Sequence, residues 1–117
     1  MERDLNMSSL RKGLLEFLVL KIVGANSVYV PDILRRLAVT EFATQEGTLY
    51  PLLSKLRREA LVQYEWQESD VGPPRKYYRL TAAGQARLTA LDEYWNRLNQ
   101  TISDLGQAPC NASSLSA

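Results

Sequence analysis

The sequence predicts a mainly α (α+β) fold: three helices, a β-hairpin and a long C-terminal helix. Apolar residues recur at helical spacing in four segments, and two short segments alternate around a Gly-Pro-Pro turn. In the last segment the apolar spacing is three, four, three, four, three. With 117 residues the chain is about one domain long.

The composition is that of an ordinary globular protein, with 45% hydrophobic and 23% charged residues. The sequence has 14 basic and 13 acidic side chains, a net charge of +1. The net charge therefore does not attract nucleic acid, and only a local basic patch could. Twelve of the basic residues occur within residues 1–80. Histidine, the common general base and metal ligand, is absent from the sequence, so we predict no enzyme, no cofactor and no metal site.

The chain reads as a cytoplasmic protein. Its one cysteine, Cys110, allows no intrachain disulfide, which fits a reducing compartment. The longest apolar run, residues 13–23, contains Glu16 and Lys21 and is too short to span a membrane. We therefore expect no membrane association.

The first predicted helix covers residues 9–23 and is apolar nearly all round. A helix of this kind is buried on more than one side, so we expect it to contact the core and a partner chain. Its apolar positions are Leu10, Leu14, Leu15, Phe17, Leu18, Val19, Leu20, Ile22 and Val23.

A loop is predicted over residues 24–30, and Pro31 suits the first turn of a second helix, where a missing N–H does no harm. The apolar inner stripe of this helix consists of Ile33, Leu34 and Leu37, and two arginines, Arg35 and Arg36, are expected to face outward.

A third helix is predicted over residues 44–58, with Thr44 as the candidate N-cap. Pro51 should delay its start or kink it slightly, because a proline beyond the first turn removes a backbone hydrogen bond. Its leucines follow the i, i+3, i+4, i+7 spacing, and the opposite face is small, polar and basic. The leucines are Leu49, Leu52, Leu53 and Leu56; the opposite face has Gly47, Pro51, Ser54, Lys55 and Arg58, flanked by Tyr50, Arg57 and Thr48.

A hairpin follows. Val62, Tyr64 and Trp66 alternate with polar residues, which predicts a strand with these three on its buried face. A six-residue tip is expected over residues 69–74, and residues 75–80 alternate again as the second strand.

The last helix is predicted from the N-cap Thr81 to about Leu105, where Gly106 ends it. Its heptad seam predicts a homodimer, because a helix of roughly 25 residues is longer than the small domain can cover. Residues 106–117 are expected to be a disordered tail. The seam consists of Leu88, Leu91, Trp95, Leu98, Ile102 and Leu105.

This order of elements matches a winged helix-turn-helix DNA-binding domain over residues 8–80, followed by a dimerisation helix over residues 81–105. In that plan the third helix enters the major groove, and the hairpin tip reaches the backbone or the minor groove. The predicted DNA-binding residues are Thr44, Glu46, Gly47, Thr48, Tyr50, Pro51, Ser54, Lys55, Arg58, Arg75, Lys76, Arg35 and Arg36.

Two strings resemble the signature of the PadR family of bacterial transcriptional regulators. They are EGTLYPLLSKLRREALV (Glu46 to Val62) and ESDVGPPRKYYRLTAAG (Glu68 to Gly84), and the resemblance covers roughly residues 10–105. It implies a homodimer that represses promoters at near-palindromic double-stranded DNA, with a recognition helix over residues 46–58 and a wing over residues 69–76.

The resemblance also implies that the first helix assists the last in dimerisation, through Leu10, Leu14 and Phe17. Members of this family are often released from DNA by a small molecule. A planar aromatic compound bound by Trp95, Leu91 and Leu14 is the candidate inducer.

The sequence departs from the family pattern at two places. Tyr29-Val30-Pro31 stands where a Tyr-Gly-Tyr-like string is usual, so contacts of the second tyrosine do not carry over. Ala60 replaces a usual glycine, and it is mildly strained if that position needs a positive φ.

Other interpretations remain open. The basic stripe could be a solvated helix face, and Trp95 could be plain dimer core rather than a ligand platform. A winged helix can also serve as a protein-interaction adaptor, which the near-neutral charge permits. An enzyme is the weakest alternative, because no spacing resembles a catalytic pair or a phosphate loop.

Overall fold

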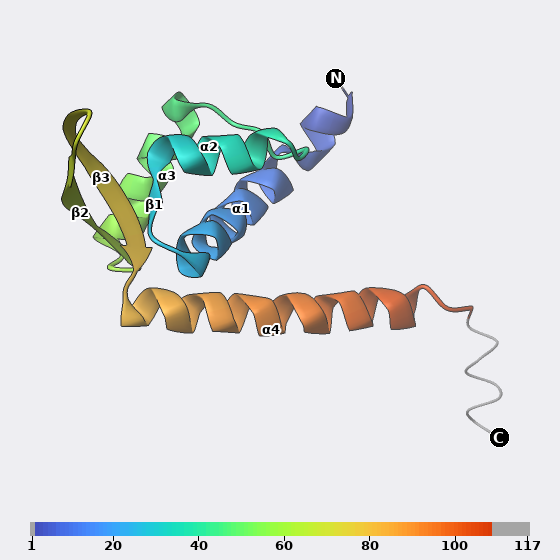
Figure 1. The fold of residues 1–117 in the computed structure, drawn as a ribbon. Helices are drawn as coiled ribbons and strands as arrows, with labels where there is room; N and C mark the ends of the chain where they lie inside the picture. Colours follow the sequence, from blue (N-terminus) through green and yellow to red (C-terminus); the bar gives the residue numbers. More distant parts are fainter. Residues whose placement is uncertain (1, 109–117) are drawn as a thin grey trace.

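The computed structural model describes residues 2–108, with side chains from Met7 onward. Four helices and one small antiparallel sheet make up the fold; the hairpin of β2 and β3 lies at one side, and the last helix runs beneath α1 and out beyond the other helices (Figure 1). This confirms the predicted mainly α (α+β) fold. The elements in chain order are α1 (Glu2–Ala25), β1 (Val28–Tyr29), α2 (Val30–Ala38), α3 (Glu46–Arg58), β2 (Val62–Ser69), β3 (Gly72–Leu80) and α4 (Ala82–Leu105).

Helix α1 supplies the centre of the core with its C-terminal half. Val19 and Leu20 have no exposed surface, and Ile22 and Val23 are also buried, whereas Leu10 near the other end is 57% exposed. The helix begins at Glu2, seven residues before the predicted start at Ser9. The apolar pattern could not reveal this first part, because residues 2–8 are mostly polar and helical periodicity reports only on buried faces.

Helix α3 places its leucine stripe against this core. Leu49, Leu53 and Leu56 are fully buried, as the spacing predicted. The predicted N-cap is wrong: Gln45 occupies that position without a side-chain bond, and its carbonyl accepts hydrogen bonds from two N–H groups of the first turn. The helix begins at Glu46, later than the predicted Thr44. Pro51 still lies beyond its first turn, inside the helix.

Ala60 joins α3 to β2 in the left-handed conformation, with a φ of 61°. The Leu61 N–H donates to the Leu56 carbonyl and the Ala60 N–H to the Arg57 carbonyl, both at 2.9 Å, which is the Schellman ending of a helix. The sequence-based expectation of strain at this position is therefore confirmed, since an alanine pays a steric cost there that glycine avoids.

The sheet has the order β1-β3-β2, with both pairs antiparallel. Strand β1 lies within the segment predicted as a loop and pairs Val28 with Tyr78 and Tyr29 with Tyr77. Two residues are too short for a periodic pattern, so this strand is decided by the neighbouring β3 rather than by its own sequence.

The hairpin is longer than predicted and its tip is shorter. Ser69 pairs with Gly72, which leaves only Asp70 and Val71 in the turn, so the six-residue tip is wrong. Pro73 and Pro74 are in β3, where β1 does not pair and next to a register irregularity in β2, so their missing N–H groups break no ladder there.

Helix α4 begins at the predicted cap, where the Thr81 hydroxyl accepts a hydrogen bond from the Gly84 N–H at 2.9 Å. Its first half packs on α1 (Figure 1). Leu88, assigned by the heptad pattern to a dimer seam, is 7% exposed and lies in the core of its own chain.

Gly84 sets how closely α4 approaches the start of β2. A Cβ atom there would lie 1.9 Å from the Leu61 carbonyl oxygen, which itself accepts a hydrogen bond from the Thr81 N–H at 3.1 Å. Backbone cannot rotate away as a side chain can, so only glycine fits.

We predict that Gly84→Ala lowers the free energy of unfolding by about 1–3 kcal/mol or more, because overpacking displaces backbone. Urea unfolding measures this change. Gly13→Ala is the matched control: its Cβ meets no atom within 4 Å, and it should be neutral or stabilising by about 0.5–1 kcal/mol. Equal midpoints for Gly84→Ala and the natural chain would contradict the close approach.

Candidate nucleic-acid interface

The outward face of α3 is open, as the sequence predicted. Gly47, Tyr50, Pro51, Ser54 and Arg58 are all exposed on it, opposite the buried leucines. A Cβ atom at Gly47 would meet nothing within 4 Å, so the chain leaves space above this turn of the helix. The face therefore offers hydroxyl groups and a guanidinium to a large partner.

Lys55 lies at the α1 edge of this face and is already paired. Its ammonium is 2.8 Å from a carboxylate oxygen of Glu16 and 3.9 Å from one of Glu59. The hydrogen bond with Glu16, followed by the charge of Glu16, raises the pKa of Lys55. The positive charge that the sequence placed here is thus paired with a carboxylate of the same chain.

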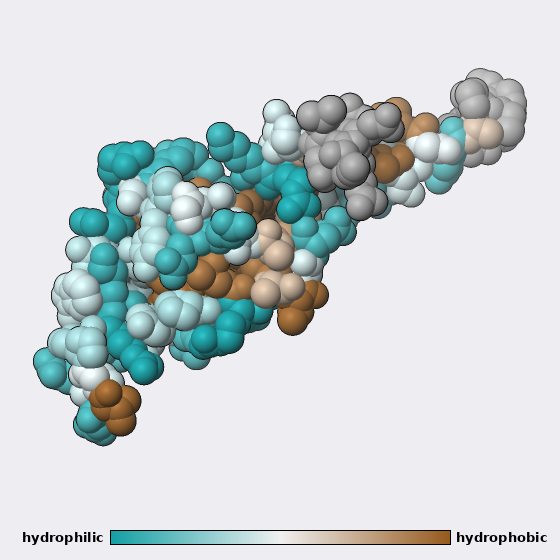
Figure 2. All heavy atoms as spheres, turned by 90° about the horizontal axis from the view of Figure 1, so that it is seen from above, coloured by the Kyte–Doolittle hydropathy of each residue, from teal (hydrophilic) through white to brown (hydrophobic). Residues whose placement is uncertain are grey.

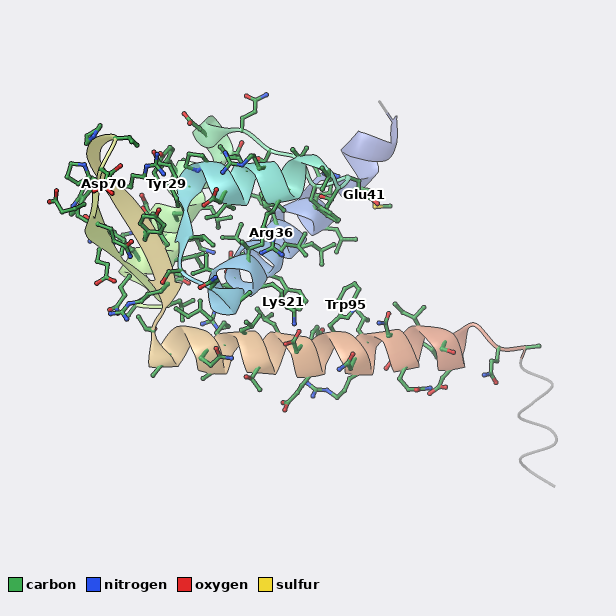
Figure 3. The ribbon with its side chains drawn as sticks, viewed as in Figure 1. Lys21, Tyr29, Arg36, Glu41, Asp70 and Trp95 are labelled. Carbon is green, nitrogen blue, oxygen red and sulfur yellow. The ribbon has the colours of Figure 1, made fainter. Side chains whose placement is uncertain are left out.

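Arg75 and Lys76, predicted together, point to opposite faces of the wing because successive residues of a strand alternate. The Arg75 guanidinium lies 5.0 Å from the ring centre of Tyr29. The Lys76 ammonium lies 4.2 Å from the ring centre of Tyr64, on the other face. Figure 3 shows Tyr29 beside β3, and Asp70 at the wing tip. Only Lys76 is on the face that α3 contacts.

Arg57 flanks the outward face of α3 on the side of the wing. Its guanidinium lies 4.6 Å from the ring centre of Tyr64, and with Ser54 and Arg58 it lines a hollow of about 300 Å³. The sequence pattern placed Arg57 on the flank of the basic stripe. It lies three residues after Ser54, on the same side of the helix, so the two residues can line one hollow.

The remaining predicted DNA-binding residues are spread more widely. Arg35 and Arg36 are exposed on α2, and Arg35 pairs with Asp32 one turn earlier. Glu46 is exposed in the first turn of α3, whereas Thr44 precedes the helix and is half-buried.

A groove of about 990 Å³ separates α1 from the loop between α2 and α3. Arg11 spans it: its guanidinium donates to the Glu41 carbonyl at 2.8 Å and lies 5.2 Å from the Phe42 ring centre. Figure 2 shows apolar surface gathered in the middle of the upper face, bordered by hydrophilic residues. The groove brings two predicted dimer residues, Leu10 and Leu14, together with two predicted DNA-binding residues, Thr44 and Thr48.

The seam of α4 divides into a covered and an uncovered half. Leu91 and Leu98 are half-buried, whereas Ile102 is 58% and Leu105 80% exposed. Trp95, 36% exposed, stands on the side of α4 that faces α1 (Figure 3). The end of the helix therefore presents apolar side chains that the described residues of its own chain leave exposed.

An aromatic contact and an ion pair add to the apolar packing between the covered half of α4 and α1. The ring centres of Phe17 and Trp95 are 6.5 Å apart, and the Lys21 ammonium lies 2.8 Å from a carboxylate oxygen of Asp92. Figure 3 shows Lys21 between the two helices.

Within residues 2–108, no three His, Cys, Asp or Glu side chains cluster as metal ligands would. None of the described helices is both long and apolar enough to cross a membrane. Cys110 and most of the predicted tail, residues 109–117, lie outside the described residues.

Comparison with known proteins identifies the family and supports the fold described above. Residues 19–90 match the model of the transcriptional regulator PadR-like family. A PadR-like transcription factor from Bacteroides fragilis is 41% identical, with a TM-score of 0.75 over 88% of this chain and 100% of that one. A PadR-like transcriptional regulator from Bacillus cereus is 32% identical, with a TM-score of 0.77 over 86% of this chain and 98% of its own. A Streptococcus transcriptional regulator is 33% identical, with a TM-score of 0.76 over 84% and 97%.

Proposed function

Because the chain belongs to the PadR-like family of transcriptional regulators, we propose that it is a sequence-specific DNA-binding repressor that acts as a homodimer. Residues 8–80 hold the DNA and residues 81–105 hold the partner chain. The observation that carries the proposal is the uncovered polar and cationic face of α3 beside a projecting hairpin. The activity is recognition rather than catalysis, and it takes place on chromosomal DNA in the cytoplasm.

The chemistry of α3 suits the major groove, which is about 12 Å wide and admits a helix. Gly47 and Pro51 permit a close approach, Ser54 and Tyr50 supply hydroxyl groups, and Arg58 supplies charge. Around this centre the interface includes further residues of the helix, its N-terminal flank, α2 and the wing. They are Thr44, Glu46, Thr48, Lys55, Arg35, Arg36, Arg75 and Lys76.

Selection from random duplexes should enrich a near-palindrome whose half-sites lie about one helical turn apart. Affinity for that sequence should fall steeply as salt rises, because phosphate contacts release counterions. An enriched protein partner together with no enriched sequence would favour the adaptor function instead.

We predict that Gly47→Ala weakens binding to the selected duplex by about tenfold, which corresponds to roughly 1.4 kcal/mol, because the added methyl group occupies the open space above α3. The helix itself should be as stable as before or more so, since alanine is the better helix former. Gel-shift titration and urea unfolding measure the two effects, and Gly13→Ala serves as the control for DNA binding. Unchanged DNA affinity of Gly47→Ala would show that this part of α3 does not lie in the major groove.

Dimerisation is supported by the uncovered half of α4. Leu98, Ile102 and Leu105 follow one another on one side of the helix, and the chain itself leaves them half-buried to 80% exposed. Burying such a stripe against a second copy is the usual reason for a heptad seam. Leu91, Trp95 and the α1 residues Leu10, Leu14 and Phe17 complete the proposed interface, whereas Leu88 is buried in the core of its own chain.

We predict that Ile102→Asp converts the dimer to a monomer and abolishes tight DNA binding, because a carboxylate would be buried in the seam. Light scattering after gel filtration gives the mass. Asn96→Asp adds the same charge on the other side of α4 and should leave the dimer intact. A dimeric Ile102→Asp protein would disprove this interface.

Release by a small molecule is the third part of the proposal. Trp95 is 36% exposed beside Phe17, and Leu91 and Leu14 are half-buried, so apolar surface remains for a planar aromatic ligand. Such a compound can stack on the indole ring.

We predict that a planar aromatic compound quenches Trp95 fluorescence and lowers DNA affinity together. The titration is repeated with Trp95→Ala, because Trp66 also fluoresces. If the loss of DNA affinity persists unchanged in that variant, Trp95 does not form the inducer site.

A further inference from the structure

We infer that Arg57, Tyr64, Trp66 and Lys76, here called the junction cluster, form a binding site for one phosphate and its sugar in the DNA backbone. The cluster lies where α3 meets the wing. The inference rests on the proposed function and refines it, because it assigns Tyr64 and Trp66, which the sequence pattern left out, and states what each member of the cluster holds.

The geometry joins the two elements through one aromatic ring. The Arg57 guanidinium lies 4.6 Å and the Lys76 ammonium 4.2 Å from the ring centre of Tyr64. Trp66 is directly across the sheet from Lys76, with its ring centre 5.4 Å from the ammonium. The rings of Tyr64 and Trp66 meet edge to face at 6.2 Å. The two cations therefore already lie near one ring before any ligand arrives, and such preorganisation reduces the entropy lost on binding.

Charge compensation distinguishes the two sides of α3. Among the described side chains, neither Arg57 nor Lys76 takes part in an ion pair, whereas Lys55 on the opposite side is bound by Glu16. Two like charges held near one ring repel each other, and a nearby anion relieves that repulsion. The wing side of α3 is thus the side on which a phosphate gains most.

The surroundings have the shape and donors that a phosphodiester needs. Ser54, Arg57 and Arg58 line a hollow of about 300 Å³, which adds a hydroxyl group and a second guanidinium. Trp66 is 62% exposed, an unusual exposure for an indole ring in a domain of this size. The exposed surface of the indole ring can pack on deoxyribose while Arg57 and Lys76 hold the phosphate oxygens. The sugar-phosphate backbone of one DNA strand would then pass between the recognition helix and the wing.

The salt dependence of binding to the selected duplex tests the phosphate contact. Arg57→Gln should lower affinity by about tenfold and reduce the slope of log K against log salt by about 2, because the homodimer loses one phosphate contact in each of its two copies. Arg57→Lys should keep the slope, because the charge remains. Arg79→Gln, on the opposite face of the wing, is the control and should match the natural chain.

Lys55→Gln extends the comparison to the other side of α3 and should change the slope less than Arg57→Gln. An unaltered slope for Arg57→Gln, or a change for Lys55→Gln of the same size, overturns the inference while the natural chain still binds DNA. If the natural chain binds no DNA at all, the proposed function itself fails.

Trp66 is tested by its own fluorescence in a Trp95→Phe background, where it is the only tryptophan, since the sequence has two. Acrylamide, a neutral quencher, should reach Trp66 freely in the unbound protein and at least about threefold less well with the selected duplex, because packing on the sugar covers the ring. Equal quenching with and without DNA would exclude Trp66 from the contact. Urea midpoints of all variants verify that they fold.

Discussion

The fold depends on the close contact between the end of α3 and the beginning of α4. The Thr81 hydroxyl donates to the Ala60 carbonyl at 2.6 Å and accepts from the Gly84 N–H, while the Leu61 carbonyl accepts from the Thr81 N–H. Gly84 has no side chain to keep these backbones apart. These hydrogen bonds and the close approach at Gly84 determine where the hairpin leaves α3 and where α4 starts. They therefore set the position of the wing and the direction of the last helix.

The two sides of α3 carry different electrostatics, although the sequence presents them as one basic stripe. Lys55 faces α1, where Glu16 binds it, and Arg57 faces the wing, where an aromatic ring holds it without neutralising it. Tertiary neighbours therefore decide which cations stay available for an anionic partner. Net charge and charge count cannot show this, because paired and unpaired cations contribute equally to both.

Helix α1 connects the regions assigned to DNA and to dimerisation. Glu16 contacts Lys55 of α3, and the next residue, Phe17, contacts Trp95 of α4. Further along, Lys21 pairs with Asp92. A shift of α1 would therefore be felt at the recognition helix and at the last helix together, which is the physical basis on which a ligand near Trp95 would act on DNA affinity.

The sequence by itself determined the elements whose signal is local and periodic. The leucine stripe of α3, the Thr81 cap and the end of α4 before Gly106 were predictable because buried faces and caps depend on spacing along one helix. The exposed stripe and the strained Ala60 followed from the same reading and from the family resemblance.

Only the tertiary structure decided the features that depend on distant neighbours. Strand β1 forms because β3 lies beside it, and Leu88 belongs to the core because α1 covers it. Trp66, predicted as buried by alternation, is 62% exposed. Alternation tells which residues share a face, but what lies opposite that face is set by packing between segments far apart in the chain.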